Sequence, residues 1–425
     1  MPMPAVDTTP APEATHLFRS TAAASVAITA AFWITMVGTT VPTPLYPLYE
    51  RAFGFSSFMV TVVFAVYALG VVAGLLVFGR LSDEIGRRPV ILLALLLAAA
   101  AAGLFIAADG LPWLLVARVL SGLAAALITG SGTAALLDLA PQRHKLRAQT
   151  VAIAANMGGL ACGTLLSGVL AEWAGSPLRL PWIVTLAMVA LTFVAALVAI
   201  APAPQGVAGP TISAGSRRQS PHQSPYRSLR PQPLRIPDEI RGPFLRAALA
   251  AGSGFAVLGV LTAVTGLFLA TVLHLTNHAL AGLVVFVAFA CTALGQLIAR
   301  ALPRRMALPV ACAGLVVAAA LVAIALLTAW LAPLLAGAAV NGLATGIAVA
   351  DGLSAINSGP QPQRRGEAVS AFFVILYSML SVPVIGVGVL IQSVGLRTAG
   401  VTFSALVAAL ALAVAISLLR SGRGE

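Results

Sequence analysis

Long apolar segments alternate with short polar ones along most of the chain. The apolar segments cover residues 21–41, 58–78, 89–108, 112–139, 147–172 and 180–201 and, after a polar interval, 244–273, 279–298, 307–328, 332–356, 368–391 and 399–419. A helix of about 20 apolar residues crosses the hydrocarbon core of a bilayer, so the pattern predicts twelve transmembrane helices. The segments are continuous rather than alternating with period two, which argues against an outer-membrane β-barrel.

Composition supports this fold class, an all-α membrane protein. Of the 425 residues, 59% are hydrophobic and 9% are charged, whereas soluble domains carry about 25% charged residues. A soluble enzyme, a secreted scaffold or a nucleic-acid binder is therefore excluded as a description of the whole chain, and we expect no enzymatic activity. Cys162, Cys291 and Cys312 lie inside apolar segments, so we interpret them as packing residues and predict neither a metal site nor a cofactor.

The distribution of basic residues predicts the orientation. The net charge is +12. If both termini are cytoplasmic, the only Lys or Arg residues in the loops on the other side of the membrane are Arg51, Arg179 and Arg397. The positive-inside rule therefore places both termini in the cytoplasm and the protein in a bacterial-type inner (plasma) membrane. The arginines of the central polar interval are expected to attract anionic lipid rather than nucleic acid.

The polar interval divides the chain into two similar halves. We expect a disordered cytosolic tail at 1–20, a six-helix bundle at 21–201, a cytoplasmic linker at 202–243, a second six-helix bundle at 244–420 and a short tail at 421–425. The Pro-rich composition of the interval is typical of a linker.

Short matches between the halves recur at a nearly constant offset. They pair Gly79, Leu81 and Arg88 with Gly295, Leu297 and Arg304, and Arg147, Val151 and Gly168 with Arg365, Val369 and Gly386. A duplicated six-helix unit predicts two pseudo-symmetric bundles that carry a substrate between them near the middle of the bilayer by alternating access.

The segment between the second and third apolar runs is the most specific motif. It reads Gly79-Arg-Leu-Ser-Asp83-Glu-Ile-Gly86-Arg87-Arg88-Pro89. Gly86 tolerates positive φ and Pro89 suits the first turn of a helix. An ordinary basic loop would explain the arginines, but not an Asp four residues before an Arg with glycines at both ends.

This motif, the span count and the linker resemble the major facilitator superfamily. A degenerate second copy ends at Arg305, with Ala299 and Leu302 in place of the Asp and the second glycine. The resemblance implies an inner latch that closes when the cavity faces outward. In that latch Asp83 would face the start of span eleven near Gly366 and Glu367, and Arg87 would pair with Asp138. The candidate latch residues are Gly79, Asp83, Gly86, Arg87, Arg88 and Asp138.

Two weaker signals follow in spans four and five. Arg118, with Gly122 four residues on, resembles the span-four motif of the family. A charge this deep requires either a cavity-facing role in coupling or a structural contact with an ion or carbonyl, and both interpretations stay open.

Gly159, Gly163 and Gly168 resemble the span-five motif of export antiporters, which has proline where this chain has Thr164. Alternatively, these small residues simply let two helices approach closely.

An ion gradient is the expected energy source. The sole lysine, Lys145, has no glycine-rich phosphate-binding loop before it, so ATP is not expected to act directly. The resemblance favours protons over sodium. Asp351 in span ten is the best candidate for proton binding, because a buried carboxyl group can load and release a proton. A packing or gate contact is the alternative for Asp351.

Aromatic and amide side chains inside the spans are candidates for the cavity lining, although each is also compatible with ordinary helix packing. They are Trp33, Tyr67, Asn156, Phe255, Asn341, Phe372 and Tyr377. A lining with little fixed charge suits neutral or weakly cationic, moderately lipophilic molecules.

The function we predict is secondary active transport, most like the twelve-span drug or metabolite:proton antiporters, with export of small organic compounds coupled to protons. The expected partners are a small-molecule substrate, protons and membrane lipids, with no nucleic acid, and we expect a monomer. A proton-coupled uptake symporter and a non-transporting sensor built on a transporter fold remain as alternatives.

Overall fold

The computed structural model describes residues 12–79, 81–200, 241–358 and 365–421. Twelve of its helices are long and apolar enough to cross a membrane, as predicted. The six of the first half are α1 (Pro12–Thr40), α3 (Ser57–Phe78), α5 (Arg87–Ala107), α6 (Leu111–Leu139), α7 (Lys145–Trp173) and α8 (Leu180–Ala199). The six of the second half are α9 (Arg241–Thr271), α10 (His278–Ile298), α11 (Arg304–Thr328), α12 (Leu331–Asn357), α13 (Arg365–Val394) and α14 (Leu396–Ser421).

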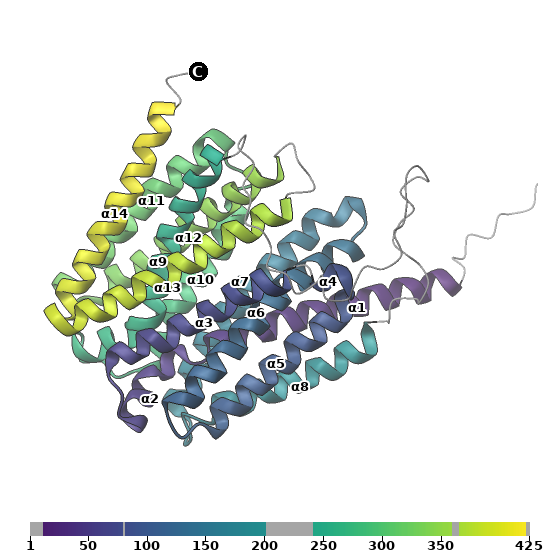
Figure 1. Ribbon diagram of the computed structural model, residues 1–425, viewed down its shortest axis with the longest axis horizontal. Helices are drawn as coiled ribbons and strands as arrows, with labels where there is room; N and C mark the ends of the chain where they lie inside the picture. The colour runs from purple at the N-terminus through teal and green to yellow at the C-terminus, as the bar shows by residue number, and fades with distance from the viewer. Residues whose placement is uncertain (1–11, 80, 201–240, 359–364, 422–425) are drawn as a thin grey trace, which may run out of the picture.

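The two halves form two helical bundles that lie side by side. Figure 1 shows the first half, purple to blue, on one side and the second half, green to yellow, on the other. Contacts between the bundles are made mainly by α7 with α10 and by α3 with α13. We call the surface between the bundles the seam. The fold class predicted from the sequence is confirmed.

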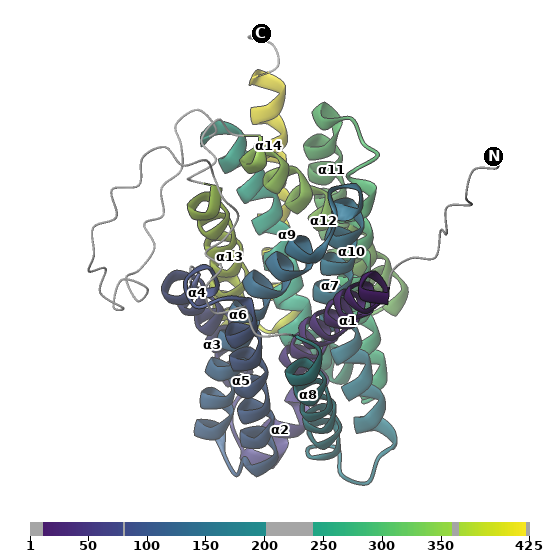
Figure 2. The same cartoon turned by 90° about the vertical axis from the view of Figure 1, so that its right-hand side faces the viewer.

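Successive spans run in opposite directions, which defines two ends of the molecule. We call the end where α1 begins and α14 finishes the tail end. The other end contains the short helix α2 (Tyr46–Phe53) and the 3-10 turn η1 (Thr43–Leu45), and we call it the α2 end. Figure 2 shows α2 at the opposite end from the finish of α14. The tail end also carries α4 (Leu81–Glu84) and the 3-10 turn η2 (Gln142–His144).

Two sequence-based boundaries were wrong. The tail expected at 1–20 is helical from Pro12 onward, since proline is tolerated in the first turn and Glu13, Ala14 and Leu17 are good helix formers. The last residues of the expected linker, 241–243, form the first turn of α9. The rest of the linker, 202–240, lies outside the described residues.

Glycines bring corresponding helix pairs of the two bundles into backbone contact. In the first bundle, a Cβ added at Gly70 of α3 would lie 2.7 Å from the Val119 carbonyl oxygen of α6. In the second bundle, a Cβ added at Gly295 of α10 would overlap the Leu343 carbonyl of α12. Gly346 of α12, about one turn after Leu343, is packed against α10 in the same way. The same close packing of equivalent spans in both halves supports the internal duplication read from the sequence.

An aromatic cluster fixes α2 to the first bundle, and the sequence pattern did not predict this helix. Trp182 Nε1 of α8 donates a 2.8 Å hydrogen bond to the Tyr49 hydroxyl of α2. The Trp182 ring stacks on Phe105 of α5, with ring centroids 4.0 Å apart. Tyr49 also stacks on Phe53, and α2 ends at Gly54, which has φ +67°. Trp182 and Tyr49 are buried, so each needs a hydrogen-bond partner within the protein, and this bond supplies it.

Candidate transport site and gates

The α7–α10 contact joins the two bundles near the α2 end. A Cβ added at Gly168 would lie 2.6 Å from the His278 carbonyl oxygen, and one added at Gly282 would overlap the Thr164 carbonyl. The Thr164 hydroxyl donates to the carbonyl of Ala161 at 2.8 Å and to that of Gly282 at 3.0 Å. Thr164, which replaces the proline of the antiporter motif, therefore supplies a polar contact across the seam.

The other two glycines of the span-five motif face α1 of the same bundle. A Cβ at Gly159 would lie 2.5 Å from the Trp33 carbonyl oxygen, and one at Gly163 would overlap the Val37 carbonyl. Their close approach is also supported by Thr40, whose hydroxyl donates to the Leu160 carbonyl at 2.7 Å. The motif thus packs α7 against a helix of its own bundle on one side and against the other bundle at Gly168.

Two tyrosines meet across the seam where α3 contacts α13. The Tyr67 hydroxyl of α3 is in side-chain hydrogen-bonding contact with Tyr377 of α13 and with Thr39 of α1. The Tyr377 ring packs edge-on against Phe255 of α9, with centroids 6.1 Å apart. Towards the α2 end, a Cβ added at Gly388 of α13 would overlap the Thr61 hydroxyl of α3. These predicted lining residues therefore lie together at the seam.

The α2 end of the seam is closed. The Pro47 ring of α2 packs on Gly266 of α9, where an added Cβ would be 2.9 Å from Pro47 Cγ. The Glu172 carboxylate of α7 accepts a 2.8 Å hydrogen bond from the backbone N–H of His278 of α10. The crevice lined by Pro47, Arg51, Gly266 and His278 has a volume of about 10 Å³, room for about one water molecule.

The tail end has a different character. Arg300, after α10, donates from Nη1 to the Thr150 hydroxyl of α7 at 2.7 Å. At the start of α13, however, Gly366 is exposed, and a Cβ added there would meet nothing within 4 Å. The seam is thus glycine-packed at the α2 end, while Gly366 near the start of α13 is not covered by any of the described residues.

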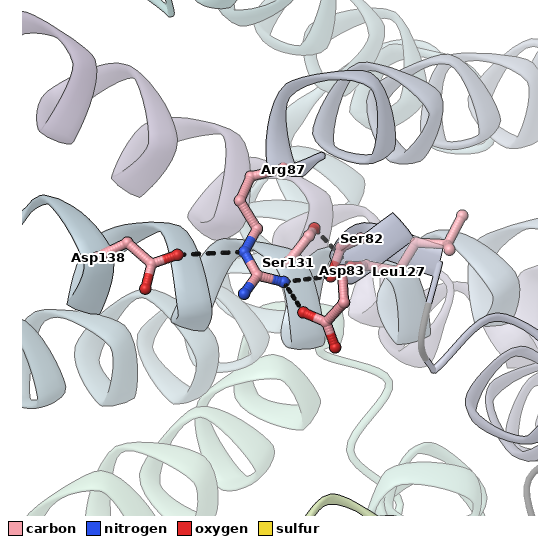
Figure 3. Close-up of polar contacts among 6 residues, drawn as sticks. All are labelled: Ser82, Asp83, Arg87, Leu127, Ser131 and Asp138. Carbon is pink, nitrogen blue, oxygen red and sulfur yellow. Dashed lines mark hydrogen bonds and ion pairs between the residues drawn. The ribbon is translucent and has the colours of Figure 1, made fainter. Parts of the chain in front are cut away.

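The loop at 79–89 is organised around Arg87 (Figure 3). Arg87 Nε donates to Asp138 of α6 at 3.2 Å, and Nη1 donates to the Ser82 hydroxyl at 2.7 Å and to Asp83 at 2.5 Å. Gly86 has φ +93°, the left-handed conformation for which a glycine was predicted there. The expected pairing of Arg87 with Asp138 is therefore present, and one guanidinium pairs with two carboxylates.

Asp83 does not have the partner that the latch requires. Its partner among the described residues is Arg87, its side chain is 63% exposed, and the expected contact with the start of α13 near Gly366 and Glu367 is not made in this conformation. Arg88 Nη2 instead donates to the Leu197 carbonyl of α8 at 3.0 Å. Gly79 directly follows α3 and is exposed.

Arg118 is bound inside the first bundle rather than open to a cavity. Its side chain is 1% exposed. Nη1 donates to the Thr39 carbonyl in the last turn of α1 at 2.7 Å, Nε donates to the Val63 carbonyl of α3 at 3.4 Å, and the guanidinium lies 4.6 Å from the centre of the Tyr67 ring. A cation at a helix C-terminus is favourable, so the structure supports the carbonyl-contact interpretation.

Asp351 lies in α12 near the tail end and is half-buried. The positive charge of Arg304, the first residue of α11, acts on it. Asp351 therefore lies partly buried near the tail end, within the electrostatic influence of one guanidinium.

The remaining predicted lining residues pack within their own bundles. Asn341 is fully buried, and its Nδ2 donates to the Gly254 carbonyl of α9 at 3.3 Å, while its Oδ1 has no partner among the residues that the structure describes. Trp33 of α1 lies against Gly158 of α7, and Asn156, also of α7, is half-buried. Phe372 is buried against Phe244, with centroids 5.8 Å apart.

Sequence reasoning missed several polar residues near the seam. Glu172 and His278 tie the bundles together, and the buried hydroxyls of Tyr46 and Thr265 have no hydrogen-bond partner within the described part of the chain. Tyr46 and Thr265 directly precede Pro47 and Gly266, which touch across the seam. The only sequence signal for Glu172 and His278 was their position at the ends of apolar segments.

Comparison with known proteins agrees with this architecture. The family model described as Major Facilitator Superfamily matches residues 28–384. Two solved structures are similar, both of a bacterial homologue of the human lysosomal transporter Spinster. The inward-facing, unoccupied form has a TM-score of 0.69 at 15% identity and covers 94% of this chain and 98% of that one. The inward-facing, occupied form has a TM-score of 0.65 at 16% identity, with coverage of 97% and 98%.

Two curated relatives from Klebsiella pneumoniae, strains 342 and MGH 78578, bear the name "Putative multidrug resistance protein MdtD". Each is 27% identical over 143 residues, which is 34% of this chain. The match spans only 30% of the length of those relatives. The match of the family model over most of the chain shows that this protein belongs to the Major Facilitator Superfamily and is a transporter.

Proposed function

We propose that this transporter exports small, moderately lipophilic organic compounds, neutral or weakly cationic, in exchange for protons. The seam is the observation that supports alternating access as the transport mechanism. Two helix bundles meet through glycine-backed contacts, Gly168 on His278 and Gly282 on Thr164, that close one end. Such contacts can separate as rigid surfaces because the packing within each bundle does not depend on them.

The closed α2 end supports an inward-facing state. The distribution of basic residues supports a cytoplasmic tail end, and on that assignment the contacts of Pro47 and Glu172 close the side that faces away from the cytoplasm. The likeness to a Spinster homologue described as inward-facing supports the same assignment. The latch role of Asp83 applies to the opposite state, in which α13 would approach α4, and its exposed carboxylate is available for that contact.

The direction of transport is proposed from two observations. The partial similarity to a protein named for multidrug resistance supports export. The side chains that meet at the seam, Tyr67, Tyr377 and Phe255, are aromatic and carry no fixed charge, and this surface suits lipophilic cargo.

Asp351 is our proposed site of proton coupling. It is a half-buried carboxylate in a span, and the nearby guanidinium of Arg304 can stabilise it when the proton leaves. Replacement by asparagine keeps the shape and removes the titratable group. We expect Asp351→Asn to retain insertion in the membrane but to lose the dependence of transport on the pH gradient, whereas full dependence in that variant would exclude Asp351.

Direction and substrate can be tested in proteoliposomes with an imposed pH gradient. A panel of neutral, cationic and anionic fluorescent dyes would be offered from the side of the tail end, with orientation checked by protease accessibility. Export predicts that dye moves from the tail end against its gradient while protons move the other way. Movement of dye and protons in the same direction would instead establish a symporter, and binding without any movement would establish a sensor.

A further inference from the structure

His278, the first residue of α10, is held by the first bundle on three sides. Its backbone N–H donates to the Glu172 carboxylate at 2.8 Å. Its imidazole interacts with the backbone of Pro44 in η1. Its own carbonyl lies against Gly168, where an added Cβ would be 2.6 Å away. Glu172, Pro44 and Gly168 all belong to the first bundle, so the start of α10 is a point of attachment between the bundles.

The bond from His278 to Glu172 has a specific electrostatic character. The first N–H groups of a helix have no partner within the helix and lie at the positive end of its dipole. Asn277 satisfies one of them within the second bundle, by accepting from the Leu280 N–H at 2.7 Å. The N–H of His278 is satisfied by a carboxylate from the other bundle. Opening the α2 end therefore removes an anion from the positive end of α10.

We propose that the Glu172 carboxylate and the first turn of α10 form a latch that holds the α2 end closed through the negative charge of Glu172, so that a neutral side chain at this position weakens the latch. We call it the outer latch. The inference rests on the proposed function in one respect, namely that the α2 end is the end that opens in the outward-facing state. Glu172 acts as a positioning residue, because it binds α10 rather than the cargo.

Few other charged groups contribute to this end of the seam. On α2, Arg51 acts on His278, and Glu50 accepts a 2.5 Å hydrogen bond from Ser57, which begins α3. The last turns of α1 present the hydroxyls of Thr39 and Thr40, which donate to carbonyls. The other charged or titratable groups at the α2 end stand in loops or at helix ends, and they are Asp109, Arg179, His274 and Arg397.

The sign of the effect follows from the bond. An N–H that donates to a carboxylate makes a stronger hydrogen bond than one that donates to a neutral carbonyl, and an anion at a helix N-terminus is favoured by the dipole. A neutral amide in place of the carboxylate removes both contributions. We expect the open population at this end to rise about two- to fivefold in Glu172→Gln.

The test measures the distance between the bundles at the α2 end in the purified full-length protein. Cys162, Cys291 and Cys312 would be replaced by alanine, and spin labels placed at Ser176→Cys and Thr328→Cys. Both positions are exposed, one in each bundle at this end. Double electron–electron resonance would be recorded for the parent and for Glu172→Gln at the same pH, with the long-distance fraction expected to be about two- to fivefold higher in the variant.

Variants identify the group that holds the α2 end closed. Glu172→Gln keeps an acceptor oxygen but no charge, so a raised long-distance fraction reports the lost charge. Asp109→Asn removes an exposed carboxylate of the same end and should behave as the parent. His278→Gln keeps the backbone N–H that Glu172 binds and should also behave as the parent. Unchanged distances in Glu172→Gln, or an equal rise in Asp109→Asn, would overturn the outer latch.

The distance measurement needs neither a substrate nor a gradient, so it separates this inference from the proposed function. A longer distance confined to Glu172→Gln in a protein that moves no protons would support the latch and contradict the transport proposal. A distance unchanged in Glu172→Gln in a protein that exchanges protons for dye would contradict the latch alone.

Discussion

The hydroxyl of Thr164 in α7 donates a hydrogen bond to the carbonyl oxygen of Gly282 in α10, 3.0 Å away across the seam. Both residues are buried. Thr164→Val preserves the shape of the side chain but removes the donor, and one such bond contributes about 1 kcal/mol. We expect the variant to fold normally and to open the α2 end about fivefold more often, as measured by the spin-label distances described above.

Thr164→Ser is the matched control for that change, since it keeps the hydroxyl and loses only a methyl group. It should show the distance distribution of the parent. If Thr164→Val and Thr164→Ser behaved alike, the hydrogen bond to Gly282 would have no part in closing the seam.

Gly282→Ala should disturb the same contact by steric means. The added Cβ would overlap the Thr164 carbonyl, so α7 and α10 must move apart. Overpacking of this kind costs about 1–3 kcal/mol, which should lower the thermal unfolding midpoint and reduce the closed fraction at the α2 end. Gly386→Ala provides the control, because a Cβ there meets nothing within 4 Å. An equal loss in both variants would point to helix flexibility instead of the seam.

Asp83→Asn should abolish transport while leaving insertion and stability almost unchanged. The ion pair of Asp83 with Arg87 is exposed, and such pairs contribute about 0–1 kcal/mol. The loss would therefore arise from the outward-facing state, in which we propose that Asp83 contacts α13. The measurements are transport in proteoliposomes and thermal unfolding in detergent, with Glu84→Gln as a neighbouring control. Full transport by Asp83→Asn would contradict the latch.

Arg118→Met should destabilise the first bundle more than it alters coupling. It removes the donors to the Thr39 and Val63 carbonyls, and hydrogen bonds from charged groups contribute about 1.5–3 kcal/mol. Arg118→Lys keeps the charge but not the planar fork, so it should recover only part of the loss. A stable Arg118→Met protein that had lost only its proton dependence would revive the coupling role.

The repetition of apolar segments was sufficient to predict the twelve spans, because span length is set by the bilayer. The conformation of Gly86 and its place in a tight loop also followed from local chemistry. The closeness of Arg87 and Asp138 came from the family resemblance, since the two residues lie 51 positions apart in the chain.

Contacts across the seam could not be predicted in this way. Nothing in the sequence near Glu172 indicates that its partner is a backbone N–H of α10, because any carboxylate at a helix end looks the same. Arg118 was equally ambiguous, since the carbonyls it binds belong to every residue. The helix α2 is too short and too polar to stand out from a loop, and only its packing against Trp182 explains it.

Because the Tyr49 hydroxyl is bonded to Trp182, α2 must travel with the first bundle when the two bundles separate. The contact of α2 with the second bundle joins the Pro47 ring to Gly266. It can separate without breaking a hydrogen bond. A molecule that leaves at this end would thus pass α2, which is fixed to the first bundle. The width of the opening would depend on how far Gly266 moves away from Pro47. A bulky side chain at position 266 would keep this opening from closing completely.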